Sequence, residues 1–405
     1  MTNEMSNVPE LRFPEFDGEW EEKMLGEVTI YKNGGSFENS VKNHGVFNLI
    51  TLKSVNTEGE LINSGKYIDD KSTETLCKGT LVMILSEQAP GLVGMTANIT
   101  RNNKYVLNQR VAALVPKQGI DSQFLSKLIN RNQKYFSVRS AGTKVKNISK
   151  GHVENFNFLA PNYTEQQKIG NFFSKLDRQI ELEEQKLSLL EEQKKGYMQK
   201  IFSQTLRFKD EEDNVYPDWI RTKLINIVTP LKGQDDNITN LPILTISASR
   251  GWLNQKERFS QVIAGNSLKK YTQVKKNDLS YNKGNSKVAK YGIVFRLKNE
   301  ALVPNVYKSF RPNENIDSIF IEKYFHNKTL DKQLRTRITS TARTDGLLNI
   351  SDQDFYDIKL YIPILQEQTK IADFLNKLDK LIEKQSSKII LLKHRKKGLL
   401  QKMFV

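Results

Sequence analysis

Two stretches of the chain carry apolar residues at alternating intervals of four and three. The first, within residues 161–202, has them at Ile169, Phe173, Leu176, Ile180, Leu187, Leu190, Tyr197 and Ile201. The second, within residues 363–405, has them at Ile371, Leu375, Leu378, Ile382, Ile389, Leu392, Leu399 and Met403. This spacing puts the apolar side chains on one helix face, in the a/d pattern of coiled coils. Each stretch therefore predicts a helix of about 40 residues, roughly 60 Å long, that needs a partner.

Several residues bear on how these helices begin and pair. Thr164 with Gln167 forms a capping-box sequence at the start of the first helix, and the second helix lacks it. A glycine falls at the same place in each helix, Gly196 and Gly398, where it costs about 1 kcal/mol relative to alanine. We expect these glycines to permit close helix–helix approach. The simplest arrangement pairs the two helices with each other, and the alternative folds each helix back on its own neighbouring domain.

The two helical stretches are copies of one another. At an offset of 202 residues, 20 of the 42 positions from 161 to 202 are identical. Both copies begin with the pattern Pro-x3-Glu-Gln-x-Lys-Ile and end with Lys-Lys-Gly-x2-Gln-Lys-x-Phe. An internal repeat of this kind determines the architecture before any other inference is made.

Weaker similarity extends the repeat beyond the helices. The matched segments are Leu11-Arg12-Phe13 with Leu206-Arg207-Phe208, Trp20 with Trp219, Ile120-Asp121-Ser122 with Ile316-Asp317-Ser318, and Asn147-Ile148-Ser149 with Asn349-Ile350-Ser351. The chain therefore divides into two related but divergent domains, residues 1–160 and 206–362. Each domain is followed by one of the repeated helices, residues 161–205 and 363–405.

The two divergent regions mix helix and strand patterns. Residues 78–85 and 278–281 follow tight-turn signals and predict strands, whereas residues 124–129 and 321–325 predict helices. The predicted fold class is α/β (α+β), with two globular domains separated by two long coiled-coil helices and an internal pseudo-twofold repeat. The order of the strands does not follow from the sequence.

The distribution of charge indicates a polyanionic partner. The net charge is +16, yet residues 1–100 hold 8 Lys and Arg against 15 Asp and Glu. Residues 101–150 hold 11 against 1, and residues 269–298 hold 9 against 1. A single basic run is usually a solvated face, but two dense runs, each late in its half of the chain, favour nucleic acid. A membrane surface fits less well, because neither run has the pattern of an amphipathic helix.

Composition excludes several other classes of protein. Hydrophobic residues make up 38% and charged residues 27%, as in soluble globular domains. No run approaches the roughly 18 apolar residues of a membrane helix, and the first residues lack the pattern of a secretory signal. The single cysteine, Cys77, excludes an internal disulfide, and we expect it to be a small buried residue at the start of a strand. We therefore expect a cytoplasmic protein.

The motifs of the expected catalytic classes are missing. The Gly65-Lys66 pair is followed by Tyr67, so it is not a phosphate-binding P-loop. There is no Pro-Pro dipeptide for an amino-methyltransferase motif, and no Glu-x-Lys follows Pro217-Asp218 as a nuclease core would need. The four histidines, His44, His152, His326 and His394, are scattered without metal-ligand spacing. We therefore expect no catalytic site and no metal site.

The chain resembles a known family along its whole length, the specificity subunits of type I restriction–modification systems of the Gram-positive kind. The two helical repeats carry the most specific part of the likeness. The segments Leu-Arg-Phe-Pro-Glu-Phe at 11–16, Thr-Ile-Ser-Ala-Ser-Arg-Gly-Trp at 245–252 and Ala-Arg-Thr-Asp-Gly-Leu-Leu-Asn-Ile-Ser at 342–351 also look like this family. The resemblance gives no information about the DNA sequence that is read.

The resemblance implies a non-catalytic reader of a two-part DNA target. It implies two target-recognition domains held apart by antiparallel helices, so that helix length sets the number of unread bases between half-sites about one helical turn (~34 Å) apart. Two methyltransferase subunits would bring S-adenosylmethionine and flip the target adenine. Two restriction subunits would bring translocation and cleavage that use ATP and Mg²⁺, and this chain itself would bind no cofactor. The helices and their flanks, present twice, would be the docking surface for two identical partners.

On this basis we expect each domain to bind phosphates with its basic face and base edges with a few polar side chains. The candidates in the first domain are Asn108, Gln109, Arg110, Arg139, Ser140, Lys144 and Lys146. Those in the second are Tyr281, Asn282, Lys283, Asn285, Ser286, Lys287, Arg343 and Asp345. Any one of them is as easily a solvated surface residue, whereas the groups favour contact. Tyr271 and Tyr291 are expected in the core.

Two other functions remain open at this point. The first is a structural nucleic-acid-binding protein in which a coiled coil joins two domains without modification partners. Co-purification with a methyltransferase would separate it from a specificity subunit. The second is an enzyme with a divergent active site, which predicts methylation or cleavage by the purified chain alone.

Overall fold

The structure, a computed structural model, describes residues 7–37, 39–70, 72–86, 91–142, 145–233, 241–255, 271–284, 289–338 and 348–405. The chain forms two compact units. The first unit contains residues 1–184 and 387–405, and the second contains residues 185–386. Candidates Lys144, Asn285, Ser286, Lys287, Arg343 and Asp345 lie outside the described residues.

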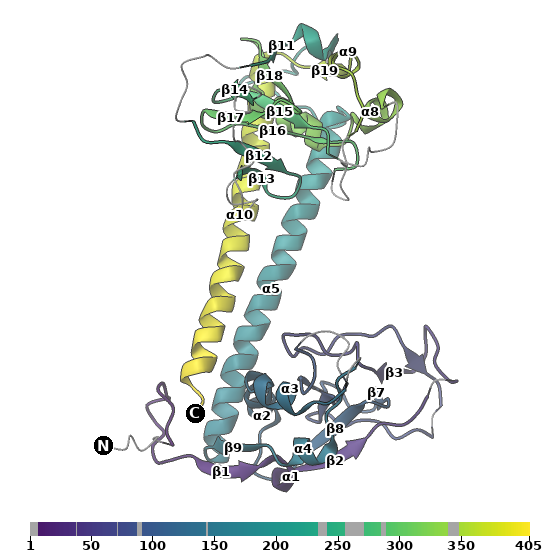
Figure 1. The fold of residues 1–405 in the computed structure, drawn as a ribbon, viewed down its shortest axis with the longest axis vertical. Coiled ribbons are helices and arrows are strands. Elements are labelled where there is room, and N and C mark those ends of the chain that lie inside the picture. Colours follow the sequence, from purple (N-terminus) through teal and green to yellow (C-terminus); the bar gives the residue numbers. More distant parts are fainter. Residues whose placement is uncertain are drawn as a thin grey trace. The chain divides into compact units, whose positions relative to one another are not determined.

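Both predicted long helices are present, and each contributes to both units. They are α5 (Tyr163–Phe202) and α10 (Leu365–Lys402), the teal and yellow helices of Figure 1. Within the first unit Asp177 pairs with Lys396 and Glu183 pairs with Lys388, so numbering rises along one helix as it falls along the other. Within the second unit Lys194 pairs with Asp379 and Tyr197 packs on Phe374, so the numbering again rises along one helix and falls along the other. The helix pairing is therefore antiparallel in each unit.

The apolar seam matches the sequence pattern with one exception. Tyr197 is 39% exposed and packs its edge on Phe374, while the next residue, Met198, is buried at 7%. The predicted polar interruptions lie within the seam, where Glu183 and Lys194 make the ion pairs just named. Near the end of the helix, Met198 therefore replaces Tyr197 as the buried residue.

Two expectations about the helices are wrong. A Cβ added at Gly196 or Gly398 would meet no atom of the described residues within 4 Å, so neither glycine serves a close approach of the two helices. The cap of α5 is Asn162 rather than Thr164, because its Oδ1 accepts the Glu165 N–H at 3.0 Å. Asparagine before the first helical turn satisfies a backbone donor that has no partner within the helix.

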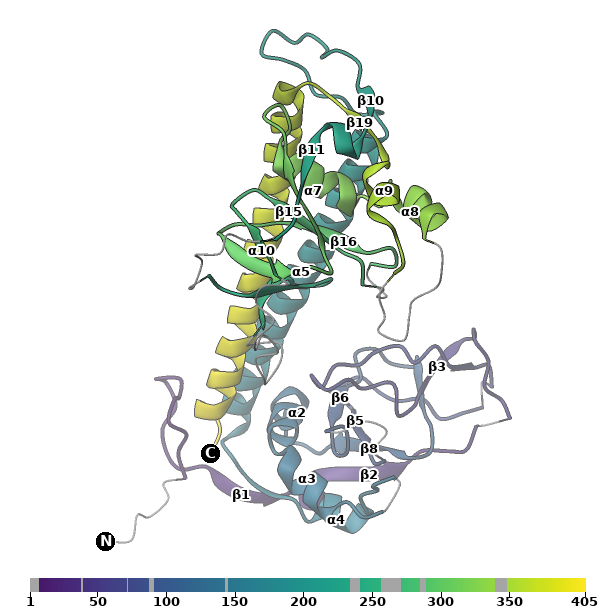
Figure 2. The same cartoon turned by 45° about the horizontal axis from the view of Figure 1, so that its top comes forward.

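The first unit is built around a four-stranded antiparallel sheet in the order β2-β8-β5-β6. These strands are β2 (Thr29–Asn33), β8 (Val111–Pro116), β5 (Leu81–Ile84) and β6 (Thr96–Asn98). A second sheet, β4-β3-β7, contains β4 (Tyr67–Ile68), β3 (Phe47–Ile50) and β7 (Tyr105–Leu107), and β1 (Glu21–Met24) pairs with β9 (Asn157–Ala160). The helices are α1 (Leu25–Val28), α2 (Ser122–Arg131), α3 (Gln133–Arg139) and α4 (Lys150–Glu154), and α2 packs beside β6 (Figure 2).

The second unit repeats this plan with the same strand order, β11-β18-β15-β16. These strands are β11 (Val228–Leu231), β18 (Lys308–Pro312), β15 (Leu279–Asn282) and β16 (Ile293–Arg296). The other pairs are β10 (Ile220–Lys223) with β19 (Lys359–Ile362), β12 (Leu244–Ser247) with β13 (Gly251–Asn254), and β14 (Tyr271–Val274) with β17 (Ala301–Pro304). The helices are the 3-10 turn η1 (Leu224–Asn226), α7 (Ser318–His326), α8 (Asp331–Arg337) and α9 (Asp352–Tyr356).

Equivalent turns lead into the central strands β5 and β15. Gly79 has φ +86° before β5, and Asn277 has φ +74° at the matching place before β15. Glycine and asparagine tolerate this left-handed backbone better than other residues do. The tight turns predicted before these strands are thus confirmed. Cys77, by contrast, is exposed rather than buried, because it lies in the loop ahead of the strand.

The repeated glutamine of each helix start fastens it to the domain that precedes it. Gln166 donates to the Pro161 carbonyl at 2.8 Å and accepts the Asp121 N–H at 3.1 Å. Gln368 donates to the Pro363 carbonyl at 2.8 Å and accepts the Asp317 N–H at 2.9 Å. Asp121 and Asp317 are the N-caps of α2 and α7. Each glutamine amide therefore joins the start of a long helix to the start of a short helix in the preceding domain.

The repeated phenylalanine at each helix end fills the core of the unit where that helix ends. Phe404 stacks on Phe124 at 5.2 Å and meets Trp20 edge-on at 6.3 Å. Phe202 contacts Phe320 at 5.7 Å and Trp219 at 6.4 Å. Such rings contribute large apolar area to a core.

In the described part of the chain, no helix is long and apolar enough to span a membrane.

Candidate nucleic-acid interface

In the first unit, two of the candidate groups meet at one residue, Leu85, directly after strand β5. The Leu85 N–H donates to the Arg110 carbonyl at 3.0 Å, and its carbonyl accepts the Ile148 N–H at 2.9 Å. Ala141 and Asn147 exchange two backbone hydrogen bonds of 2.9 and 2.8 Å and close a loop that contains Lys146. Arg110 and Lys146 are both exposed. The structure thus brings two separate basic loops to the same end of the central sheet.

The residues around Arg110 have structural roles. Arg110 has φ +66°, and the preceding Asn108 and Gln109 form the tight connection from β7 to β8. The Asn108 N–H donates to the Ile50 carbonyl at 3.0 Å, and the Gln109 N–H donates to the Gly35 carbonyl at 2.7 Å. A Cβ on Gly34 would lie 1.9 Å from the Asn108 carbonyl oxygen, so the two backbones touch. Arg110 is the exposed member of this trio.

Arg139 and Ser140 lie at the end of α3. The Arg139 guanidinium carbon lies 3.8 Å from the centroid of the Tyr135 ring, and the side chain is exposed. This stacking, together with a hydrogen bond of 3.3 Å from the guanidinium to the Tyr135 carbonyl, holds the charged group at the surface. The Ser140 hydroxyl donates to the Ser137 carbonyl at 2.7 Å and so satisfies a helix-end acceptor.

In the second unit, Tyr281 is a correction to the predicted contact set. It is fully buried, stacks on Phe355 at 4.6 Å and donates its hydroxyl to the Tyr291 carbonyl at 2.6 Å. Burial raises the pKa of its phenol. A Cβ on Gly292 would lie 2.5 Å from the Tyr281 ring, so this glycine, at φ +82°, makes room for it. Tyr281 is a core residue, and Tyr271 is buried as expected.

Asn282 and Lys283 follow Tyr281 at the end of β15. Asn282 donates to the Ile246 carbonyl at 3.2 Å and accepts the Gly284 N–H at 3.0 Å, which shapes the turn. The Lys283 carbonyl accepts the Leu348 N–H at 2.9 Å. Lys283 and Leu348 flank the two segments that contain the remaining candidates of this domain. The residue after the strand is therefore joined to the residue just before Asn-Ile-Ser, whereas in the first unit Leu85 is joined to Ile148 within that motif.

Two carboxylates that the sequence did not single out order the basic side chains of the second unit. Asp278, buried at 1%, accepts two hydrogen bonds from Arg311 at 2.7 and 2.8 Å. Asp352 accepts hydrogen bonds from Lys232 and Lys308, which lower its pKa to about 2. These cations have partners within the protein and contribute less to a free basic surface.

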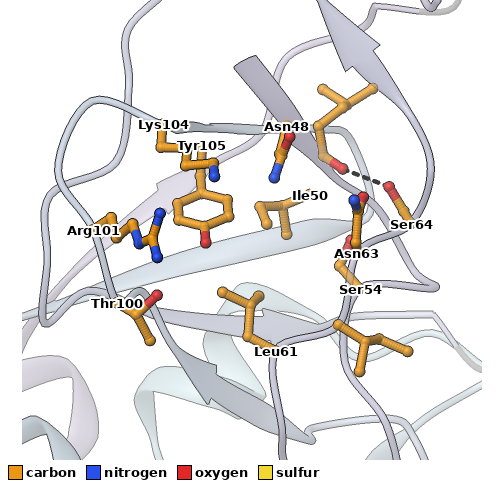
Figure 3. A pocket seen from close by; sticks show the side chains of 12 residues that line it. Asn48, Ile50, Ser54, Leu61, Asn63, Ser64, Thr100, Arg101, Lys104 and Tyr105 are labelled. Carbon is orange, nitrogen blue, oxygen red and sulfur yellow. Dashed lines mark hydrogen bonds between the residues drawn. The ribbon is translucent and has the colours of Figure 1, made fainter. Parts of the chain in front are cut away.

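A polar pocket in the first unit was also not foreseen. It encloses about 310 Å³ between β3, β7 and the loop of residues 54–64. Figure 3 shows Arg101 and Tyr105 on one side, Asn63 and Ser64 on the other, and the apolar side chains of Ile50 and Leu61 between them. Arg101 and Lys104 are the first two cations of the basic run at 101–150, which was the available signal. Among the described residues, no group of three or more histidine, cysteine or acidic side chains could hold a metal ion.

Comparison with known proteins gives one consistent result. Residues 17–192 and 222–393 each match the family model described as type I restriction modification DNA specificity domain. The type I restriction enzyme MjaVIII specificity subunit of Methanocaldococcus jannaschii is 25% identical over 69% of this chain and 69% of its own length.

Solved structures share the fold. The type I restriction–modification S subunit from M. genitalium superposes with a TM-score of 0.63 at 17% identity, covering 98% of this chain and 99% of that one. A structure described as the basis of complex assembly and conformational transition of the type I R-M system matches with a TM-score of 0.52 at 14% identity, over 95% and 97% of the two chains.

Proposed function

The chain belongs to the family of type I restriction–modification DNA specificity domains, and we propose that it reads a two-part DNA target, one part with each unit. Members of this family recognise DNA and perform no catalysis. The observation that carries this proposal is the duplication of a complete domain, with the same strand order and the same attachment to the helices. A duplicated reader fits a target with two half-sites.

We propose residues 1–160 and 206–362 as the two target-recognition domains, and residues 161–205 and 363–405 as the spacer between them. In the first domain the proposed DNA contacts are Arg110, Arg139, Lys144 and Lys146. In the second they are Lys283, Asn285, Ser286, Lys287, Arg343 and Asp345. Asn108, Gln109, Ser140 and Asn282 would position these loops, as their backbone and side-chain hydrogen bonds indicate. Helix length would set the number of unread bases, so that inserting residues in both helices would abolish methylation of the unaltered target.

The partners proposed for this chain are two methyltransferase subunits and two restriction subunits, which would supply S-adenosylmethionine, ATP and Mg²⁺. The long helices support a twofold docking surface, because exposed leucines recur at the same position of each helix. Leu189 is 58% exposed and Leu391 is 69% exposed. Gly196 and Gly398 lie seven residues further on, on the same helix face, with open space around them. Assembly with DNA and these partners would place the chain in the cytoplasm.

The deciding experiment maps adenine methylation across a genome, with and without this chain, in cells that hold the partner methyltransferase. We expect one split motif to be methylated only when the chain is present. The purified chain alone should neither methylate nor cleave DNA, and it should co-purify with the methyltransferase. Methylation that does not depend on the chain would contradict the proposal, and DNA binding without a methyltransferase partner would support the structural-protein alternative.

A further inference from the structure

The pocket of Figure 3 has the chemistry of an anion site. Its polar lining consists of Asn48, Arg101, Lys104 and Tyr105 together with Ser54, Asn63, Ser64 and Thr100, and among the described residues no carboxylate lines it. This absence is informative, because Asp and Glu outnumber Lys and Arg by 15 to 8 over residues 1–100. The described residues of this acid-rich part of the domain thus leave the pocket free of negative charge.

The two cations at the pocket are not used by the fold. Among the described residues, neither Arg101 nor Lys104 makes a side-chain hydrogen bond or an ion pair, and the same holds for the side chains of Asn48 and Tyr105. Other lysines of the same unit are paired, for example Lys42 with Asp69 at 2.8 Å and Lys32 with Glu74. A guanidinium and an ammonium that line one pocket without a counter-ion among the described residues favour a bound anion.

The backbone of the domain holds the pocket in shape. Strands β3 and β7 run parallel, and the Asn48 N–H donates to the Lys104 carbonyl at 2.9 Å, which fixes these two residues next to each other. On the opposite wall, the Ser64 hydroxyl donates to the Leu49 carbonyl at 2.9 Å. The site is therefore formed before a ligand binds, and little ordering of the chain is needed.

We propose that this pocket anchors a backbone phosphate of the DNA bound by the first domain, with Arg101 and Lys104 contacting the phosphate oxygens. Asn48 and Tyr105 can donate further hydrogen bonds, and the apolar floor of Ile50 and Leu61 accepts the deoxyribose beside the phosphate. Such a contact fixes the position of the domain on the duplex without reading a base. The inference rests on the proposed function, since it names a contact for the DNA that the chain reads.

The test compares DNA binding by the complex of full-length chain and methyltransferase, with the wild-type chain and with Arg101→Ala/Lys104→Ala. The probes are a short duplex with the mapped target and one with a scrambled sequence, each titrated at several salt concentrations. Each neutralised phosphate contributes about 0.9 to the slope of log affinity against log salt. Because the pocket holds one phosphate, the slope should fall by roughly one. Affinity for both duplexes should fall by a similar factor. Lys42→Ala, which removes a paired cation from the same unit, should leave the slope unchanged.

The outcomes separate this inference from the proposed function. If the wild-type complex shows no preference for the mapped target, the proposed function fails. If the preference is present but the double variant keeps the wild-type slope, the phosphate anchor is overturned. A loss confined to the target duplex also overturns it, since that would mark a base-reading contact. Arg101→Lys should keep most of the slope, and unchanged thermal unfolding of each variant shows that the fold is intact.

Discussion

At the scale of single residues, each unit depends on one buried carboxylate at the start of a long helix. Glu165 and Glu367 are both fully buried, and each accepts two hydrogen bonds from an arginine, Arg12 and Arg207 respectively. The arginine also binds backbone carbonyls of its own segment, so the pair ties the Leu-Arg-Phe motif to the helix. A buried charge is tolerated only with such a partner.

We expect Arg12→Ala to destabilise the first unit by about 3–5 kcal/mol, the usual effect of stranding a buried charge. Arg207→Ala should cost the second unit less, because the Trp219 indole N–H still donates to Glu367 at 3.1 Å. Among the described residues, the equivalent Trp20 nitrogen has no partner and gives Glu165 no such support. Chemical denaturation that resolves the two units measures both effects.

The control is Arg178→Ala, which breaks an exposed pair with Glu181 on the same helix. Its cost should stay below about 1 kcal/mol. Equal losses for Arg178 and Arg12 would show that burial of the carboxylate does not decide the effect.

A second residue-scale prediction concerns acid stability. Asp352 has a pKa lowered from 3.8 to about 2 by Lys232 and Lys308, so its ion pairs favour the folded state above pH 4. This contribution is lost as the pH falls through the folded pKa. Asp352→Asn should therefore be less stable than wild type at pH 7, and the difference should shrink between about pH 4 and pH 2. Stability curves that run parallel over this range would contradict the assignment.

The repeated motifs are visible in the sequence, but the partners of their residues in the fold could not be predicted from it. Leu-Arg-Phe and Glu-Gln were visible as twin patterns, yet their ion pairs join residues 153 and 160 positions apart. Periodicity and spacing describe local structure and carry no information about such distant partners. Tyr281 shows the converse, since its place after a strand suggested a contact loop, whereas the space left by Gly292 makes it a core residue.

At the scale of elements, the long helices were the most predictable part of the fold. Their apolar period sets one face, and nearly every predicted seam position is buried or half-buried. The short strands were less predictable, because their order is set by packing between segments far apart in the chain. Strands β3 and β7 pair in parallel although residues 51–104 separate them.

Gly196 and Gly398, which have open space at their Cβ positions, lead to a prediction that two measurements can check. Because nothing lies near their Cβ positions, Gly196→Ala and Gly398→Ala should each stabilise the chain by roughly 1 kcal/mol. If a partner docks on the face shared with Leu189 and Leu391, the same changes should weaken capture of the methyltransferase. Thermal unfolding and co-purification measure the two effects. If both variants are stabilised but still bind the methyltransferase as the wild type does, the docking surface does not include this helix face.

At the scale of the whole molecule, the end of each long helix contacts a Leu-Arg-Phe segment. In the second unit the chain runs directly from one to the other, whereas in the first unit hydrogen bonds and an ion pair join them without a covalent connection. In the second unit, the Leu206 N–H donates to the Lys200 carbonyl at 3.0 Å across residues 201–205. In the first unit, the Leu11 N–H donates to the Lys402 carbonyl at 2.8 Å, and Lys402 pairs with Glu10. The segment after α10 thus lies beside residues 10–11 in the same way that the segment after α5 runs into residue 206.

This equivalence predicts that the chain tolerates circular permutation. Joining Val405 to Pro9 places three residues between Phe404 and Leu11, as there are between Phe202 and Leu206. A permutant opened between Gln204 and Thr205 should fold with nearly wild-type thermal stability and bind the same DNA. One opened between Glu184 and Gln185 should be much less stable, because it breaks α5. Equal behaviour of the two permutants would contradict this reasoning.

The position of Phe404 also has a consequence for the chain while it is being made. The first unit lacks Phe404, and with it part of its aromatic core, until residue 404 has left the ribosome. At roughly 5–20 residues per second, the 221 residues after Glu184 take on the order of 10–40 s to synthesise. Throughout this interval the nascent domain exposes the apolar surface around Trp20 and Phe124 that Phe404 later covers. The domain made first is thus completed only after the second unit has been made, and a chaperone that shields this surface would be needed most before residue 404 emerges.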